Sequence, residues 1–447
     1  MIRSATTARR TALGIVILCA VLFGSAEAAA AAAPRDALQQ AQRDVHALAQ
    51  QATARPATAA ASALGRATVA GLWIDALEAD APPYGRNVFT ATAQAVEDLA
   101  GVSAPDARTA VNLIVAADRR LAEGTIDEAH GGTAALLATA RKAVSAGDRL
   151  THAGKLAAAI HSYAKAWQSA YGALAHLVAD KVTHIPSGVL AAAAEQALSA
   201  TRFGMAAPRI EQSLPPLISA GKPEFFYAGS EACPFCGVQR WGMVVALSQF
   251  GTFSNLHLMQ SVASNPARVR TFTFFGSSYR SPYISFVPVE VWSNVPKPPG
   301  LARLQTLTRP ESALLHKFDP AVETPFIDIA NRFITDRSTV SPKLIAHKSW
   351  TQIAGALTDS SNVSTQAIAG EAEVMTAEVC EATGGNPQSV CSSTVVQQYE
   401  AALPTLTGRG GSCPAPPSPG GPPPARDGKG SRPAGPDPVA TAARCQG

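Results

Sequence analysis

Two cysteines separated by two residues, Cys233 and Cys236, carry the clearest chemistry in this chain of 447 residues. The segment at 224–228 (EFFYA) predicts a strand before them, and a helix is predicted from Pro234 to about Phe250. A helix N-terminus presents free N–H groups and a partial positive charge, which favour a thiolate on the first cysteine. A thiolate attacks a disulfide, and a second thiol one turn further on resolves the mixed disulfide. The spacing therefore predicts Cys233 as the nucleophile and Cys236 as the resolving cysteine.

Two other interpretations of this pair are a zinc half-site and a structural disulfide. Zinc would need two more Cys or His ligands at matching spacing, but Cys380 and Cys391 are too far apart for a zinc knuckle. The histidines downstream of the pair are isolated in the sequence: His257, His316 and His347. A disulfide between residues three apart closes too small a loop to contribute much stability. Redox chemistry is therefore preferred, and neither a metal nor a cofactor is predicted.

Cys380 and Cys391 flank a Gly-rich turn between two predicted helices. A disulfide there would pin an αα-hairpin and stabilise the fold by roughly 3 kcal/mol. We predict this structural role, while a second redox pair that relays electrons to Cys233 and Cys236 is the alternative. Cys413 and Cys445 lie in the C-terminal tail, where they pair either with each other or with another chain.

The first residues have the order of a secretory signal. Arg9 and Arg10 precede an apolar run at 11–24, and Ala26-Glu27-Ala28 offers a cleavage site between small residues. The run is short for a membrane span, which needs about 20 residues. We therefore predict a signal peptide at 1–28 and an extracytoplasmic location, secreted or associated with the cell envelope. If the segment is retained, it anchors the chain to the membrane.

Charge and composition exclude one class of partner. Lys and Arg total 37 against 33 Asp and Glu, and no basic stripe of the kind that DNA-binding proteins use is visible. Nucleic acid is therefore not an expected partner. The tail at 408–447 consists mainly of Gly, Pro, Ser and Arg, and such a composition buries too little apolar surface to fold.

The fold class follows from a change of composition near Pro208. Residues 36–202 are rich in Ala, Leu, Gln and Glu, which are strong helix formers, and predict a helical bundle that is either a spacer or a partner-binding module. At 208–403, predicted strands alternate with helices and extra helices follow, which indicates an α/β domain. Pro288 marks the strand at 285–292 as an edge strand. The chain is therefore predicted to be an α+β multidomain protein.

A strand, a CxxC at a helix start, and a later X-Pro that opens a strand together resemble the thioredoxin superfamily. The later element is Thr324-Pro325, directly before a predicted strand at 326–330. The resemblance implies that this proline is cis and that Thr324 binds the backbone of the substrate beside the cysteines. Without the resemblance, an ordinary trans Thr-Pro at a strand start would be expected.

Four stretches sharpen the resemblance, in the order FFYAGSEACPFCGVQRW, TFTFFGSSYRSPYISFVPVE, TPFIDIANRF and VCEATGGNPQSVC. Together they are similar to an exported bacterial and archaeal thioredoxin-like family known as domain-of-unknown-function family 929. The similarity covers about residues 208–403 and leaves the helical half outside. It implies a thioredoxin-like fold and a thiol-disulfide activity, but no substrate.

The chain departs from typical thioredoxins at one position. Six residues before the first cysteine those proteins usually carry a buried acid, and here the residue is Tyr227. Glu231 is a candidate substitute that we expect to be exposed. The departure leaves the direction of the reaction open among oxidant, isomerase and reductant.

Two functional hypotheses result. The first is an exported thiol-disulfide oxidoreductase that acts on the thiols or disulfides of proteins. The second is a non-enzymatic envelope protein that binds or scaffolds partners, with a thioredoxin-like fold and an inert disulfide. Fold alone does not decide between them.

Overall fold

The computed structural model describes residues 32–51, 55–82, 84–200, 208–211, 213–262, 268–297, 299–320, 324–338 and 340–406. The predicted signal peptide at 1–28 and the predicted tail at 408–447, with Cys413 and Cys445, lie outside the described residues. The chain divides between Leu177 and Val178 into two compact units. Among the described residues, no helix combines the length and the apolar composition that a membrane crossing requires.

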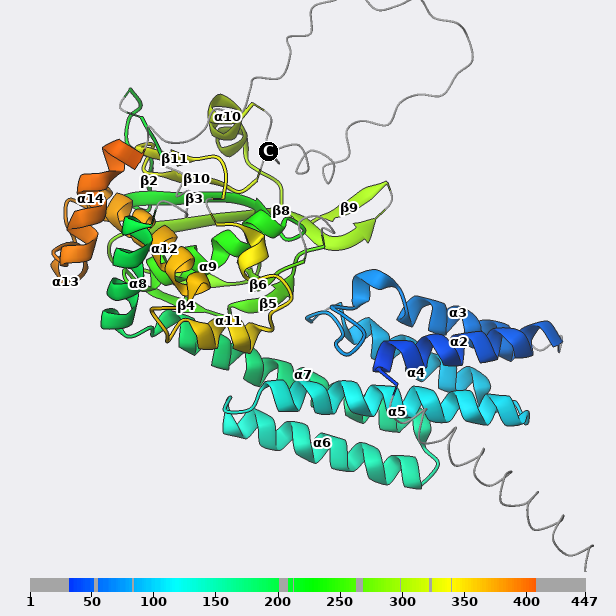
Figure 1. Cartoon of the computed structure of the whole chain (residues 1–447). Coiled ribbons are helices and arrows are strands. Elements are labelled where there is room, and N and C mark those ends of the chain that lie inside the picture. Colours follow the sequence, from blue (N-terminus) through cyan, green and yellow to red (C-terminus); the bar gives the residue numbers. More distant parts are fainter. Residues whose placement is uncertain are drawn as a thin grey trace, which may run out of the picture. The chain divides into compact units, whose positions relative to one another are not determined.

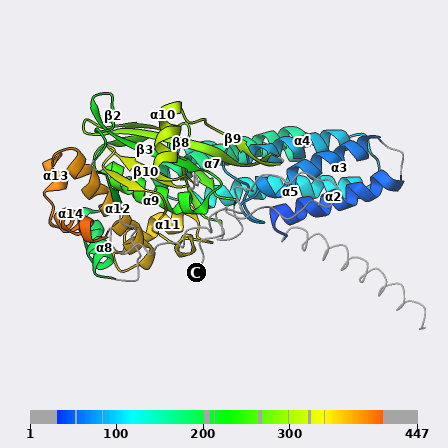
Figure 2. The same ribbon diagram turned by 90° about the horizontal axis from the view of Figure 1, so that it is seen from above.

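The first unit is helical. Its helices are α2 (Pro34–Gln51), α3 (Arg55–Ala67), the short 3-10 helix η1 (Ala70–Leu72), α4 (Arg86–Leu99), α5 (Pro105–Glu128), α6 (Ala134–His152) and the first part of α7 (Leu156–Thr183). Helix α2 packs against α3 and α5, and α3 packs against α4 (Figure 1; Figure 2). Alanines such as Ala60 and Ala63 are fully buried, so the helices approach closely with little side-chain bulk between them.

The second unit is built around a mixed sheet. Its strands are β1 (Arg209–Ile210), β2 (Ile218–Ser219), β3 (Lys222–Ser230), β4 (Thr252–Ser254), β5 (His257–Gln260), β6 (Arg270–Thr273), β7 (Ser278–Arg280), β8 (Ser285–Lys297), β9 (Gly300–Arg303), β10 (Phe326–Ile329) and β11 (Phe333–Thr335). The main sheet has the order β1-β11-β10-β3-β8-β9, with β2 also paired to β3. Strands β3 and β8 are parallel, whereas β10 runs antiparallel to β3. The ladders β4–β7 and β5–β6 are separate.

Strand β3 is buried on both faces, as its alternating side chains show. Phe226 and Ala228 belong to a core cluster that includes Leu315 and Phe318 of α10 (Arg309–Phe318). On the other face, the ring of Tyr227 contacts Phe274 edge-on. This double burial explains why the strand is a continuous apolar run rather than an alternating one.

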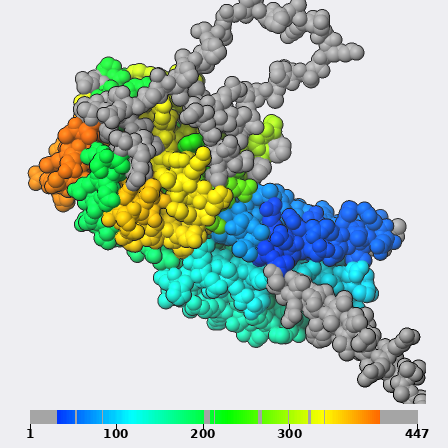
Figure 3. Space-filling view, viewed as in Figure 1, coloured from blue at the N-terminus to red at the C-terminus, as the bar shows by residue number. Residues whose placement is uncertain are grey.

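Helices complete the second unit: α8 (Ser187–Ser199), α9 (Pro234–Ser248), η2 (Pro342–Leu344), α11 (Trp350–Ala356), α12 (Val363–Ala382), α13 (Gln388–Cys391) and α14 (Thr394–Leu406). Helix α12 packs against α8, α9 and α14. In Figure 3 the green α8 segment and the orange C-terminal helices adjoin on one face of this unit. The order of a helical region, a mixed sheet and C-terminal helices confirms the predicted fold class at this level.

Two features differ from the expectations of the sequence. Helix α8 falls in the predicted bundle at 36–202, yet it packs against α12 of the second unit, because an Ala-rich segment indicates a helix without specifying its neighbour. Strand β8 continues past the predicted strand at 285–292 to Lys297, and β9 pairs only with its later part, so β8 is an edge strand around Pro288 but not beyond Trp292. Its pairing with β9 begins only at Trp292, so Pro288 sits beyond the paired stretch, where its missing N–H removes no ladder bond to β9.

Candidate functional site

The site begins where β3 ends and α9 begins. Cys233 is the N-cap residue of α9, with an extended backbone, and its Sγ accepts the backbone N–H of Cys236 at 3.3 Å. Pro234 occupies the first turn, where its missing N–H leaves no helical bond unmade. The backbone N–H of Cys233 donates to the carbonyl of Ser230, the last residue of β3, at 3.2 Å. The end of the strand thus fixes the first cysteine at the positive end of the helix.

A segment distant in sequence completes the site. The peptide bond between Thr324 and Pro325 is cis. The Cys233 thiol donates to the carbonyl oxygen of Thr324, with 3.5 Å between Sγ and that oxygen. Strand β10 follows directly and pairs with β3, with Phe326 opposite Ala228. This register brings the start of β10 to the cysteines.

The two thiols differ in exposure and in acidity. Cys233 is half-buried and Cys236 is fully buried. The hydrogen bond with the Cys236 side chain lowers the pKa of Cys233 to about 7, against an opposing effect of burial. Burial raises the pKa of the Cys236 thiol, and a negative charge on Cys233 raises it further. Near neutral pH the outer sulfur is therefore partly a thiolate, while the inner sulfur keeps its proton.

A buried ion pair that was not predicted from the sequence lies beside the two cysteines. Arg240 of α9 binds both carboxylate oxygens of Glu290 on β8, at 2.8 and 2.7 Å, and both side chains are fully buried. The available signal was a charged residue inside each of two otherwise apolar segments, the helix at 234–250 and the strand at 285–292.

Glu231 was expected to be exposed, and that expectation is wrong. Only 4% of its surface is accessible. Its Oε2 accepts the backbone N–H of Asn294 on β8 at 3.4 Å. Burial raises the pKa of Glu231, and the nearby negative charge of Glu290 adds to that shift. The cause is the long strand β8, which runs past the end of β3 and covers the loop.

Tyr227, at the position where typical thioredoxins carry an acid, is fully buried. Its hydroxyl has no hydrogen-bond partner among the described residues. Gly229 provides the room for it, because a Cβ atom at Gly229 would collide with the Tyr227 hydroxyl. Burial raises the pKa of Tyr227, and the titratable groups around it are Arg240, Glu290 and the two cysteines.

The second predicted pair lies elsewhere in the unit. Cys380, near the end of α12, and Cys391, in α13, form a disulfide with a Cα–Cα distance of 5.5 Å. Gly384 and Gly385, both with positive φ, make the turn between them. The structure thus brings Cys233, Cys236, Thr324 and Pro325 together. The Cys380–Cys391 disulfide lies apart from them and spans the turn between α12 and α13.

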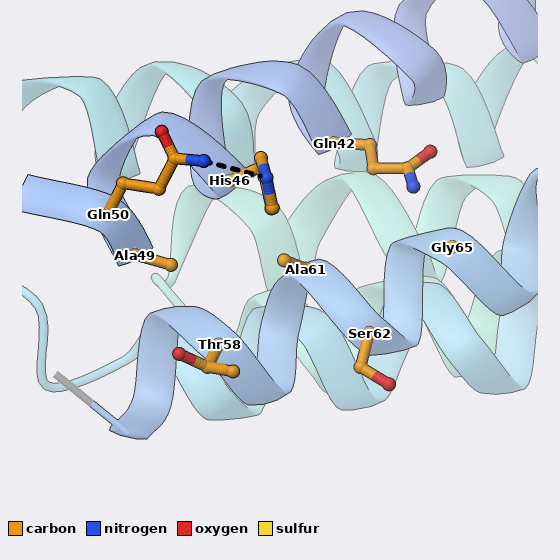
Figure 4. Close-up of a pocket in the computed structure, with 8 residues that line it drawn as sticks. All are labelled: Gln42, His46, Ala49, Gln50, Thr58, Ala61, Ser62 and Gly65. Atoms are coloured by element: carbon orange, nitrogen blue, oxygen red, sulfur yellow. Dashed lines mark hydrogen bonds between the residues drawn. The ribbon is translucent and has the colours of Figure 1, made fainter.

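No group of three or more His, Cys, Asp or Glu side chains in the described part of the chain is arranged to hold a metal ion. A cavity between α2 and α3 of the first unit is shown in Figure 4. It is lined by Gln42, His46, Ala49, Gln50, Thr58, Ala61, Ser62 and Gly65. Gln50 Nε2 and His46 Nε2 lie 3.1 Å apart in it, and its lining contains no Cys, Asp, Glu, Lys or Arg.

Comparison with known proteins covers part of the second unit. No curated protein and no solved structure matches the chain. Of the four stretches that carried the resemblance, FFYAGSEACPFCGVQRW and TFTFFGSSYRSPYISFVPVE fall within the segment that a family model matches, and the other two fall beyond it. That segment, residues 210–296, matches the family described as Domain of unknown function (DUF929).

Proposed function

We propose that this chain is an exported thiol-disulfide oxidoreductase with a thioredoxin-like domain, acting on the thiols or disulfides of proteins. The observation that carries the proposal is the asymmetry of the cysteine pair. Cys233 is half-buried at a helix N-terminus with its pKa lowered to about 7, whereas Cys236 is buried with its pKa raised. An accessible thiolate backed by a protonated thiol is the arrangement that disulfide exchange needs.

In the reductive direction the Cys233 thiolate attacks one sulfur of a substrate disulfide. A bond forms between Cys233 and that sulfur, and the other substrate sulfur leaves as a thiolate. Cys236 then loses its proton and attacks Cys233 Sγ, which releases the second substrate thiolate and forms the Cys233–Cys236 disulfide. The substrate gains two electrons and the pair loses two. The oxidative direction is the reverse of these steps.

The carbonyl of Thr324 supports the placement of the substrate. It lies 3.5 Å from Cys233 Sγ, two residues before β10 begins. A backbone acceptor beside the nucleophile suits an extended peptide, whose N–H groups need partners when it lies against a protein. Export is supported by the charged, apolar and small-residue order of residues 1–28. If that segment is retained, the enzyme would work at the membrane surface.

The reduction potential of the Cys233–Cys236 pair tests this proposal. Glutathione buffers set the poise, and thiol alkylation with peptide mass analysis reads each cysteine separately. We expect a value between about −120 and −270 mV, the range of catalytic pairs. A value below about −300 mV would mark an inert disulfide and would favour the scaffold hypothesis.

Trapping gives a second, direct test. A Cys236→Ser variant removes the resolving thiol, so a mixed disulfide between Cys233 and a peptide substrate should accumulate. The matched Cys233→Ser variant should form no adduct through the remaining cysteine of the pair, because Cys236 is buried and protonated. Full exchange activity in Cys233→Ser would contradict the assignment.

A further inference from the structure

Arg240 is a fully buried cation next to the cysteine site. Burial is the largest single effect and acts to lower the pKa of its guanidinium, but the charge and hydrogen bonds of Glu290, together with Tyr227 and Cys236, outweigh burial and raise that pKa, so Arg240 stays charged. Glu290 is itself fixed. Its Oε1 accepts the backbone N–H of Phe274 at 3.5 Å, and its own backbone N–H donates to Gln305 Oε1 at 2.8 Å. The guanidinium therefore has one defined position.

That position connects directly to the nucleophile. Arg240 Nη2 donates to the carbonyl oxygen of Ser230 at 2.8 Å, and the same oxygen accepts the backbone N–H of Cys233 at 3.2 Å. One guanidinium thus joins α9, the end of β3 and, through Glu290, β8. Since Arg240 lies one turn after Cys236 on α9, it holds the loop of the first cysteine against the helix of the second.

The same charge acts on the titratable groups around it. The Cys236 side chain is the main cause of the lowered pKa of Cys233, and Arg240 adds to it in the same direction. Burial raises the pKa of Cys236, and Arg240 opposes that shift. Buried Glu231 and buried Tyr227 also feel this cation, while Glu290 carries the opposing negative charge. A thiolate formed at Cys233 is therefore placed within the field of a fixed positive charge.

A stabilising role alone gives little reason for such a pair. Buried ion pairs are often replaced by apolar side chains of similar volume with no loss of stability, because both charges must be removed from water. The link through Ser230 to Cys233 supplies a different reason. We propose that Arg240, held by Glu290, is the positioning residue of the cysteine site, fixing the loop of Cys233 and presenting a constant positive charge to both sulfur atoms. This inference rests on the proposed function and deepens it.

Two variants test the proposal. The double variant Arg240→Met with Glu290→Leu removes both charges and keeps a similar side-chain volume. The protein should therefore fold with a melting temperature near that of the wild type. Its rate of Cys233 alkylation by iodoacetamide at pH 7 should fall about threefold, because a smaller fraction of the sulfur is thiolate. Arg240→Lys keeps the positive charge but loses the planar guanidinium with its several N–H donors. Its alkylation at pH 7 should change less than about twofold, while exchange with a peptide disulfide should slow about tenfold.

A matched control is the double variant Arg332→Met with Glu381→Leu. It removes another arginine–glutamate pair of the same unit, at 3.0 Å and partly exposed, and should leave both readouts unchanged. If the Arg240 variants fold and match the wild type in alkylation and exchange, the proposal is overturned. If the double variant does not fold, Arg240→Lys alone decides: a wild-type exchange rate then overturns the proposal.

Failure of the proposed function would look different. Wild-type protein would then exchange no disulfide at all, yet the alkylation of Cys233 would still report the charge of Arg240. Failure of the inference alone leaves wild-type exchange intact and shows no difference between the wild type and the folded Arg240 variants.

Discussion

The carbonyl oxygen of Thr324 lies 3.5 Å from the Sγ atom of Cys233, although the two residues are 91 positions apart. The antiparallel pairing of β10 with β3 produces this contact, because Phe326 lies opposite Ala228. The nucleophile therefore lies between the N-terminus of α9 and the carbonyl of Thr324, two residues before β10. A substrate that reaches the sulfur also meets that part of the chain.

The hydrogen bond from Cys236 makes the acidity of Cys233 a property of the pair. In Cys236→Ala, the largest contribution to the lowered pKa is lost, while the backbone N–H at position 236 still donates to Sγ. We expect the midpoint of Cys233 alkylation to rise from about 7 toward the ordinary value of 9.0. At pH 7 the alkylation rate should fall about fivefold. An unchanged midpoint would show that the helix N-terminus, not the second thiol, sets the acidity.

Two buried tyrosines give a matched comparison of hydroxyl groups. Tyr399 donates to the carbonyl of Ala194 at 2.8 Å, whereas the Tyr227 hydroxyl has no partner among the described residues. Tyr399→Phe should lower the free energy of unfolding by about 1 kcal/mol, because the carbonyl of Ala194 loses its donor. Tyr227→Phe should leave it unchanged or raise it by up to about 1 kcal/mol, because a buried unsatisfied hydroxyl is removed. Chemical denaturation of the two variants checks this, and an equal loss in both would contradict it.

Gly229 extends the comparison. A Cβ atom there would collide with the Tyr227 hydroxyl and ring. Gly229→Ala should therefore destabilise the fold by about 1–3 kcal/mol, as overpacking does. Gly300→Ala in β9 is a fitting control, because nothing lies within contact of a Cβ atom at that position. Wild-type stability in Gly229→Ala would mean that the Tyr227 ring has another place to go.

More of the site than of its surroundings could be predicted from the sequence. Cys233, Cys236 and Thr324-Pro325 could be selected because strand, helix and X-Pro signals are local. The burial of Glu231 could not, since it depends on how far β8 runs past β3, which no local pattern records. The pairing of Arg240 with Glu290 is likewise a contact across 50 positions. Each residue stands out as a charged residue in a largely apolar segment, but nothing in the sequence shows that the two side chains meet.

The fold likewise has features that could be predicted from the sequence and features that could not. Breakers such as Pro105 and Gly131 mark helix ends, so the helical region was predictable. The assignment of α8 to the second unit was not, because its alanines suit any close neighbour. Composition gives the type of an element, whereas burial against one particular partner decides its place.

The disulfide between Cys380 and Cys391 should act on stability and not on the reactive pair. Replacing both cysteines by serine removes a closed loop with a sequence separation of 11. The free energy of unfolding should fall by roughly 3 kcal/mol. The alkylation midpoint of Cys233 and the potential of the Cys233–Cys236 pair should stay at their wild-type values. A shifted potential would instead favour the alternative in which this bridge relays electrons to the site.

Stability should also depend on pH through a carboxyl group buried in α12. Burial raises the pKa of Glu373 to about 7, and Gln249 Nε2 donates to its Oε1 at 3.3 Å. The unfolded chain loses this proton near pH 4, its ordinary range. Between about pH 4 and pH 7 the folded state therefore binds more protons, so the free energy of unfolding falls as the pH rises through this window. Above pH 7 the loss from this group is complete.

Glu373→Gln isolates that contribution, because the amide keeps an oxygen acceptor for Gln249 and carries no charge. At pH 8 the variant should be more stable than the wild type by up to about 3 kcal/mol, and at pH 4 the difference should shrink toward zero. Glu195→Gln, an exposed acid on α8, is the control and should show no such dependence. Denaturant titrations at both pH values measure the difference. Equal stability of Glu373→Gln and wild type at pH 8 would mean that the Glu373 carboxylate is compensated within the core, and that its proton is not held by burial.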